Sequence, residues 1–122
     1  MSDKTAYFEF TGSQPTDRFV IKLDDSQKIH HARRILAGQE KAKIHVAGTI
    51  ISKRVPYNTS WSYHLQSESI QFFEVAIEVC DADMRYIEEH LNQIGGSFLP
   101  KAHWCPWNSK LTREVALTEI ET

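Results

Sequence analysis

The chain has 122 residues, a formal net charge of −2 and 41% hydrophobic residues, an ordinary composition for one folded globular domain. A slightly acidic balance argues against a dedicated nucleic-acid binder, because such domains are usually basic. No apolar run approaches the roughly 20 residues that span a bilayer. The first residues lack the basic and then apolar pattern of a signal peptide, which favours a cytoplasmic protein or one exported unconventionally. We therefore expect a single domain over residues 1–122 without a membrane span.

Charge is distributed unevenly along the chain. Residues 22–54 carry eight basic and three acidic side chains, whereas residues 65–92 carry one basic and seven acidic side chains. Two solvated helix faces of opposite sign are the simpler explanation. A dipolar surface that steers a partner is the alternative.

Two alternating segments begin the chain and predict strands over residues 7–11 and 18–23, joined as a hairpin by turn-forming residues. Residues 24–26 then supply capping oxygens for a helix. This helix runs to about Leu36, and Gly38 fits the position that ends it.

The middle of the chain alternates again. We predict strands over residues 43–53, 61–65 and 73–79. Gly48 interrupts the first of these, which indicates a bulge or a close backbone approach. In the second strand the odd-numbered residues should face one side and the even-numbered residues the other.

The last third of the chain predicts one helix and one strand. Asp81 is a suitable cap for a helix whose apolar residues recur at helical spacing as far as Ile94, before two glycines. Residues 97–109 look irregular, and residues 111–120 predict an edge strand. The element order ββαβββαβ indicates an α+β fold. We expect an antiparallel sheet of about five to six strands with two helices packed on one face.

Two clusters of aromatic and polar residues are the most distinctive chemistry of the sequence. Rings with polar tips give a large contact area at low entropic cost, which suits a binding site. The alternative is that these rings close the open end of a small sheet, where indole and phenol groups find backbone partners. We predict one partner-binding face built from Tyr57, Asn58, Trp61, Tyr63, His64, His103, Trp104 and Trp107.

Catalytic and metal sites have weaker support. His64, His103 and Cys105 offer nitrogen and sulfur donors that zinc or copper accepts, but their spacing matches no known ligand pattern. Ser62 with His64, and His103 with Cys105, are two residues apart and would share one face of a strand. No nucleophile-elbow or phosphate-binding glycine motif accompanies them. We therefore predict no catalytic residue, metal or cofactor, and keep a cryptic metal or thiol enzyme as a further alternative.

Cys80 and Cys105 are the only cysteines, and they do not form a CxxC pair. A disulfide between them requires that the fold bring them together. Two isolated, buried thiols are the commoner outcome. The sequence therefore leaves their redox state open.

Two further segments suggest other functions. Lys53 and Arg54 lie in a loop that Pro56 stiffens, and such a loop could enter a protease cleft, so a protease inhibitor or a toxin-like effector is an alternative. Residues 28–43 form a basic amphipathic stretch of the kind that calmodulin binds. Within a folded domain its apolar stripe should already be buried on the sheet, so binding would require partial unfolding.

Seven segments carry a pattern similar to one known family: residues 8–12, 17–23, 31–36, 56–58, 61–65, 76–81 and 104–107. Together they resemble the amino-terminal domain of a slime-mould calmodulin-binding protein, a domain that also occurs as a short stand-alone bacterial protein. The resemblance extends over about residues 6–115. It implies calmodulin as a partner by kinship only, and it carries over no catalytic residue. We therefore favour a non-enzymatic module that recognises a protein or a small ligand through the aromatic and histidine face.

Overall fold

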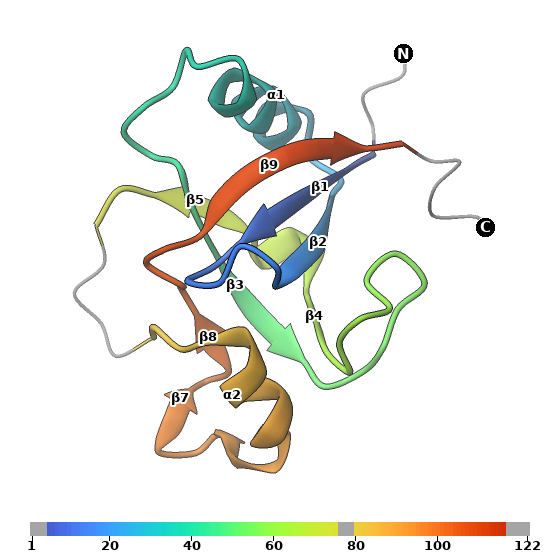
Figure 1. Cartoon of the computed structure of the whole chain (residues 1–122), viewed down its shortest axis with the longest axis vertical. Helices are drawn as coiled ribbons and strands as arrows, with labels where there is room; N and C mark the ends of the chain where they lie inside the picture. The colour runs from blue at the N-terminus through green and yellow to red at the C-terminus, as the bar shows by residue number, and fades with distance from the viewer. Residues whose placement is uncertain (1–4, 76–79, 117–122) are drawn as a thin grey trace.

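The computed structural model describes residues 5–75 and 80–116, which form an α+β fold (Figure 1). The predicted α+β class is thereby confirmed. Figure 1 shows α1 at one end of the molecule beside β1 and β9, and α2 at the opposite end beside β7 and β8. The elements are β1 (Ala6–Thr11), β2 (Arg18–Leu23), α1 (Ser26–Leu36), β3 (His45–Ile51), β4 (His64–Leu65), η1 (Ser67–Ser69), β5 (Gln71–Phe73), α2 (Met84–Glu89), η2 (Leu91–Gln93), β6 (Ile94–Gly95), β7 (Phe98–Pro100), β8 (His103–Trp104) and β9 (Lys110–Val115).

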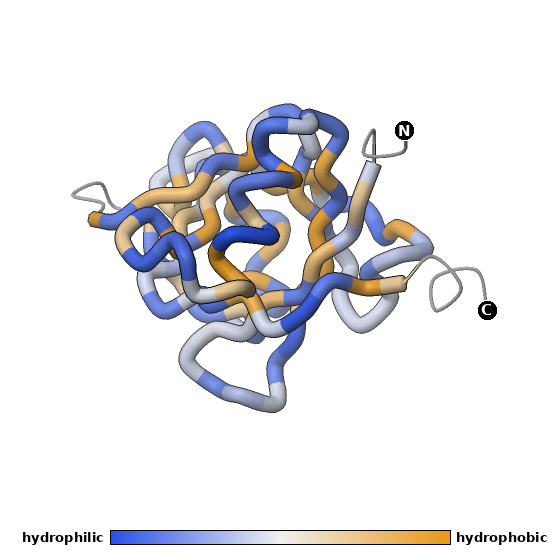
Figure 2. The backbone as a smooth tube through the Cα atoms, turned by 90° about the horizontal axis from the view of Figure 1, so that it is seen from above, coloured by the Kyte–Doolittle hydropathy of each residue, from blue (hydrophilic) through white to orange (hydrophobic). Residues whose placement is uncertain are grey.

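The predicted hairpin is present as β1 and β2, which pair antiparallel with Phe8 opposite Ile21. On its other side β1 pairs with β9, so that β9 is an edge strand of a three-stranded sheet, as predicted. The final residues of that predicted strand, 117–120, lie outside the described residues. One face of this sheet is buried in the core, and Phe8, Phe10, Phe19 and Ile21 on β1 and β2 are 0% exposed. Figure 2 shows short hydrophobic and hydrophilic stretches that follow one another along the backbone.

Helix α1 also begins and ends as predicted. The Asp25 carboxylate accepts a hydrogen bond from the Gln27 backbone N–H at 2.8 Å, and so caps the first turn. Past the last turn, Gly38 has a φ of 78°, a left-handed conformation that favours glycine. The apolar residues Ile29 and Ala32 are buried against the sheet.

Strand β3 is the centre of a second group of strands. It pairs antiparallel with β4 and β5 and also with the short strand β8. Gly48 in β3 is indeed a point of close approach, but side chains make it: a Cβ there would lie 3.3 Å from Leu65 Cδ1 and 3.4 Å from Ile70 Cγ1. Within the described residues hydrogen bonding thus divides the strands among three sheets: β2-β1-β9, β3 with its three partners, and the short parallel pair β6-β7.

Strand β4 is shorter than predicted, because it contains only His64 and Leu65 of the predicted strand 61–65, and β5 is displaced from its predicted bounds. Only Phe73 of the predicted strand 73–79 lies in β5, and residues 76–79 are outside the described residues. The turn η1 separates β4 from β5. There the Ser69 hydroxyl accepts a hydrogen bond from the Thr49 backbone N–H at 2.8 Å, in place of a partner from a strand ladder.

Helix α2 is shorter than predicted. The prediction that Asp81 caps it was wrong, because the helix starts at Met84 with Asp83 at the cap position. Asp81 instead accepts a hydrogen bond from the Trp107 backbone N–H. The helix ends at Glu89 because His90, with φ −131° and ψ 31°, leaves helical geometry.

The segment that looked irregular contains β7 and β8. Three residues that are not glycine, Leu99, Lys101 and Ala102, have φ values of 49°, 61° and 60°. Such residues rarely adopt this left-handed conformation, so no sequence pattern indicates it. The turn sets His103 and Trp104 beside β3. Within the described residues no helix has the length and hydrophobicity to cross a membrane.

Candidate functional site

Three residues of the two predicted aromatic clusters, Trp61, Tyr63 and Trp104, meet inside the core. The rings of Tyr63 and Trp104 are 5.9 Å apart, and those of Trp61 and Tyr63 are 6.1 Å apart. Trp104 and Tyr63 are 0% exposed and Trp61 is 7% exposed. In this position the three side chains stabilise the domain, as the alternative of a structural plug supposed.

Their polar tips are all bound to backbone oxygens of other segments. The indole N–H of Trp61 donates to the Arg18 carbonyl at 2.7 Å. The Tyr63 hydroxyl donates to the Met84 carbonyl at 3.0 Å, and the Trp104 indole N–H donates to the Ala82 carbonyl at 2.9 Å. Burial raises the pKa of the Tyr63 hydroxyl above its ordinary value. These buried polar groups are thus satisfied without a ligand.

Asn58 has a similar structural position. Its side chain is buried, accepts a hydrogen bond from the Val20 backbone N–H at 2.9 Å, and donates one to the Tyr63 carbonyl at 3.1 Å. These bonds fasten the loop before β4 to strand β2.

Tyr57, in that loop, and His64, the first residue of β4, lie together at the surface. Both side chains are partly exposed, and their rings are 6.4 Å apart. His64 Nδ1 is 2.7 Å from the Lys53 carbonyl oxygen. Desolvation raises the pKa of Tyr57 to about 12. The loop thus offers an aromatic pair, but its histidine is already engaged.

The candidate inhibitor loop does not present Arg54 freely. The Arg54 guanidinium donates to the Thr59 carbonyl and to the Ser62 hydroxyl, the latter at 3.1 Å. Lys53 is exposed, and its carbonyl is the partner of His64. An arginine bound to its own loop is a poor choice for insertion into a protease cleft, so the inhibitor hypothesis gains no support.

Trp107 differs from the other two tryptophans because 45% of it is exposed. It lies in a turn that runs from Pro106 to Ser109, and hydrogen bonds between these two residues close the turn. The Ser109 backbone N–H donates to the Pro106 carbonyl at 3.0 Å, and the Ser109 hydroxyl donates to the same carbonyl at 2.7 Å. That hydroxyl also accepts from the Val46 backbone N–H at 2.8 Å, which fastens the turn to β3.

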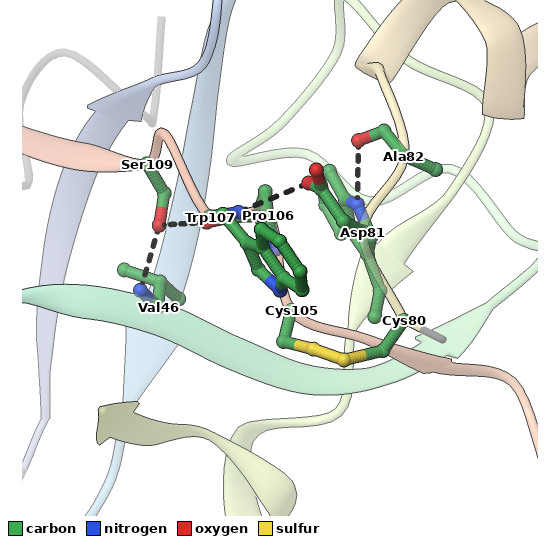
Figure 3. The surroundings of a disulfide bond; sticks show 9 residues. Val46, Cys80, Asp81, Ala82, Cys105, Pro106, Trp107 and Ser109 are labelled. Carbon is green, nitrogen blue, oxygen red and sulfur yellow. Dashed lines mark hydrogen bonds between the residues drawn. A yellow bond between two sulfur atoms is a disulfide. The ribbon is translucent and has the colours of Figure 1, made fainter. Parts of the chain in front are cut away.

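The segment that carries Trp107 is also joined to residues 80–82. Cys80 and Cys105 form a disulfide, so the alternative of two isolated thiols was wrong. The Cys105 backbone N–H donates to the Cys80 carbonyl at 2.8 Å, and the Trp107 N–H donates to the Asp81 carboxylate at 3.0 Å. Figure 3 shows Trp107 and Asp81 joined in this way beside the disulfide. Trp107 is therefore exposed, and the segment that carries it is fixed to residues 80–82 by the disulfide and by hydrogen bonds.

A small cavity lies beside this turn, with a volume of about 140 Å³. Two carboxylates line it, those of Asp81 and Asp83, and none of the described lysines and arginines does. Each carboxylate has one oxygen engaged: Asp81 Oδ1 accepts from Trp107, and Asp83 Oδ1 accepts from the Ser13 hydroxyl at 3.0 Å. The other lining residues are Gly12, Ser13, Ala82, Met84, Trp104, Pro106 and Asn108.

A larger cavity, of about 470 Å³, lies beside Trp61. Two of its charged groups already pair with each other: the Arg85 guanidinium binds both oxygens of the buried Asp17 carboxylate, at 2.8 and 3.0 Å. This contact raises the pKa of Arg85 above its ordinary value. The cavity is lined by Thr16, Asp17, Arg18, Ser60, Trp61, Arg85, Glu88 and Glu89, a mixed set that favours neither an anion nor a cation.

The set of metal ligands kept as an alternative, His64, His103 and Cys105, is not assembled as such in the structure. His103 and Cys105 do lie together, but their third neighbour is Cys80, and the three ligand atoms are all within 4.8 Å of one another. His64 is bound to the Lys53 carbonyl in another loop. The thiol needed for nucleophilic catalysis by Cys105 is absent while the disulfide is formed.

Comparison with known protein families matches residues 4–118 to the model of the BP-74 N-terminal domain. The chain belongs to this family. The match agrees with the resemblance to the amino-terminal domain of calmodulin-binding proteins, and it indicates a binding or interaction module and points away from an enzyme. Neither the curated proteins nor the solved structures include a match to the chain. The family does not identify a partner, and the basic helix α1 has its apolar residues Ile29 and Ala32 buried, so calmodulin stays a prediction from kinship.

Proposed function

We propose that this domain is a non-enzymatic protein-binding module that docks a basic segment of its partner beside Trp107. The docking surface, called here the Trp107 surface, consists of Trp107, Asn108, Asp81, Asp83 and Ser13. The observation that supports it best is an aromatic side chain that is 45% exposed on a segment held by a disulfide and by several hydrogen bonds.

Tryptophan suits this role for a physical reason. Exposed tryptophans are frequent anchors of protein interfaces, since one ring buries a large area. Binding also costs the entropy of any group that it immobilises. The backbone around Trp107 is already ordered, which lowers this entropic cost of binding. The turn between Pro106 and Ser109 is fixed to β3, and the segment is linked to Cys80.

Charge indicates the partner. The cavity beside the turn has the Asp81 and Asp83 carboxylates in its lining, and each keeps an oxygen free of the hydrogen bonds described above. A lysine or arginine side chain could place its charged head there and its aliphatic part, or its guanidinium plane, against the indole. A basic segment therefore complements both features of the Trp107 surface.

The Trp107 surface contains only one residue of the predicted aromatic and histidine face. Of its tryptophans only Trp107 is exposed, while Trp61 and Trp104 are buried. Tyr57 and His64 belong to a different loop, near Lys53. The proposed site is thus one end of the predicted face together with two aspartates that the sequence analysis did not select.

The test uses the full chain, labelled with ¹⁵N, and three short peptides of equal length that carry lysine, glutamine or glutamate at the same positions. We expect the lysine peptide to shift the Trp107 indole resonance and to bind at least about tenfold more tightly than the other two. Trp107→Ala should lower its affinity by about tenfold or more. Asp83→Asn, which keeps an acceptor and removes the charge, should weaken binding and its dependence on salt.

Tyr86→Ala is the matched control, because Tyr86 is exposed to a similar degree, 48%, and packs instead against His90 and Phe98. It should leave the affinity unchanged. Equal binding of all three peptides, or an affinity that Trp107→Ala leaves intact, would overturn the proposal.

A further inference from the structure

We infer that Cys80, His103 and Cys105 form a binding site for a zinc ion once the disulfide between the two cysteines is reduced. Two thiolates and an imidazole are a donor set that Zn²⁺ binds well in proteins. The sulfur and nitrogen atoms of the three residues already lie within 4.8 Å of one another. The inference goes beyond the proposed function: that proposal uses the disulfide to hold the segment of Trp107, whereas this one concerns the two cysteines after reduction.

The backbone sets the geometry of the site. His103 and Cys105 are two residues apart in and just after strand β8, so their side chains project from the same face. The Cα atoms of Cys80 and Cys105 are 5.1 Å apart. Zinc–sulfur bonds of about 2.3 Å in a tetrahedral site need the two sulfurs roughly 3.7 Å apart. After reduction the two cysteine side chains would have to rotate apart to reach that separation, which is below the 4.8 Å that bounds the ligand atoms now.

Reduction would not separate the two segments, since other bonds hold them together. The Cys105 backbone N–H donates to the Cys80 carbonyl at 2.8 Å. The Trp107 N–H binds the Asp81 carboxylate, and the Trp104 indole binds the Ala82 carbonyl. These three bonds join consecutive residues of one segment to the other. A ligand set that stays assembled without its disulfide loses little entropy on binding metal.

Because Cys80 and Cys105 are buried, their thiolates are more stable with a bound metal ion than without one. Cys80 is 2% exposed and Cys105 is 1% exposed, and thiolates without a compensating charge are unstable in such surroundings. A zinc ion supplies that charge. His103 is partly exposed, so the fourth coordination position can face solvent and hold water, as in open zinc sites.

Reduction and metal binding involve the same two sulfur atoms. A dithiol reductant transfers two electrons and two protons to the Cys80–Cys105 disulfide, giving two thiols and the oxidised disulfide of the reductant. Zn²⁺ then displaces the two thiol protons and accepts a lone pair from the neutral His103 imidazole. In the reverse direction, a small-molecule disulfide accepts two electrons from the two thiolates and becomes two thiols, the Cys80–Cys105 bond forms again, and Zn²⁺ is released. The cysteines therefore support a disulfide or a zinc site, and not both together.

The experiment compares the full chain in oxidised and reduced form. After reduction by a phosphine and removal of the reductant without oxygen, one equivalent of Zn²⁺ should appear in the native mass spectrum. Co²⁺ in its place should give the absorption of a tetrahedral thiolate complex. The oxidised protein should bind neither ion. Bound zinc should also slow the alkylation of the two cysteines by iodoacetamide by about tenfold or more.

His103→Gln should lower the zinc affinity about tenfold or more. His64→Gln is the matched control, because His64 is partly exposed like His103 but is not among the three clustered ligand residues, and it should have no effect. Equal zinc binding by the oxidised protein, no zinc on the reduced protein, or an unchanged affinity in His103→Gln would each overturn the inference. Since His103 is partly exposed, its substitution leaves the core intact, and a circular dichroism spectrum like that of the parent protein verifies this.

Discussion

Trp104 and Trp107 are separated by two residues, yet the fold gives them opposite environments. Trp104 is 0% exposed, its ring contacts Phe19 and Tyr63, and its indole N–H is bound to the Ala82 carbonyl. Trp107 is 45% exposed on a turn beside two aspartates. One ring therefore stabilises the domain while the other is available to a partner.

The difference comes from the backbone that carries each ring. Trp104 is in β8, opposite Gly48 of β3, so its side chain enters the core between the sheets. Trp107 follows Pro106, where the chain has left the strand and turns back towards Ser109. Identical side chains can thus serve packing or recognition, and the sequence motif that contains both does not tell them apart.

The largest expected effect is that of Trp104→Ala. Removal of a fully buried indole leaves a cavity and an unpaired Ala82 carbonyl, so the free energy of unfolding should fall by about 3–5 kcal/mol. Urea denaturation of the two proteins measures this change. A loss within about 0.5 kcal/mol, as small as that of an ordinary surface substitution, would contradict the contrast between the two rings.

The disulfide should have the next largest effect. It joins residues that are 25 positions apart, and a loop of that length stabilises the folded state by about 3 kcal/mol. The double variant Cys80→Ala/Cys105→Ala should show this loss in urea denaturation, measured without metal. Each single variant should lose at least as much. If the double variant were as stable as the parent protein, the segments that contain Cys80 and Cys105 would be held together by hydrogen bonds alone.

Alkaline pH should lower the stability of the folded domain through two tyrosines. The pKa of Tyr57 is raised to about 12, and burial raises that of Tyr63 as well, from an ordinary value of 10.0. Above that ordinary value the unfolded chain loses protons that the folded state retains. The free energy of unfolding should therefore fall as the pH rises from about 10 to 12. Tyr57→Phe should make this decline less steep, and an unchanged slope would show that Tyr57 does not contribute.

The smallest expected effect on stability is that of Trp107→Phe, which should change the free energy of unfolding by less than about 0.5 kcal/mol. Its fluorescence should change clearly, because Trp107 is the exposed member of the three tryptophans. Acrylamide should quench one accessible component in the parent protein, and that component should be absent from the variant. Quenching that persists in Trp107→Phe would place one of the other indoles at the surface.

Much of the fold followed from local pattern alone. Strand β2 and helix α1 have the predicted limits, because alternation, an aspartate cap and a terminal glycine are local signals with local causes. The limits of β5 and α2 differ from the predicted ones because other segments supply the hydrogen bonds there, through Ser69 and Asp81. Such bonds depend on residues that are distant in the sequence.

For the candidate site, too, some features follow from the sequence and others only from the tertiary structure. The sequence determined that the aromatic residues near positions 61 and 104 are distinctive, and residues 4–118 identify the family. Only the tertiary structure decided that Trp61 and Trp104 are buried, that Trp107 is exposed, and that Cys80 meets Cys105. The physical reason is that exposure and donor geometry depend on how β3 and β8 approach each other. Three left-handed residues, which sequence patterns do not mark, set the course of the chain there.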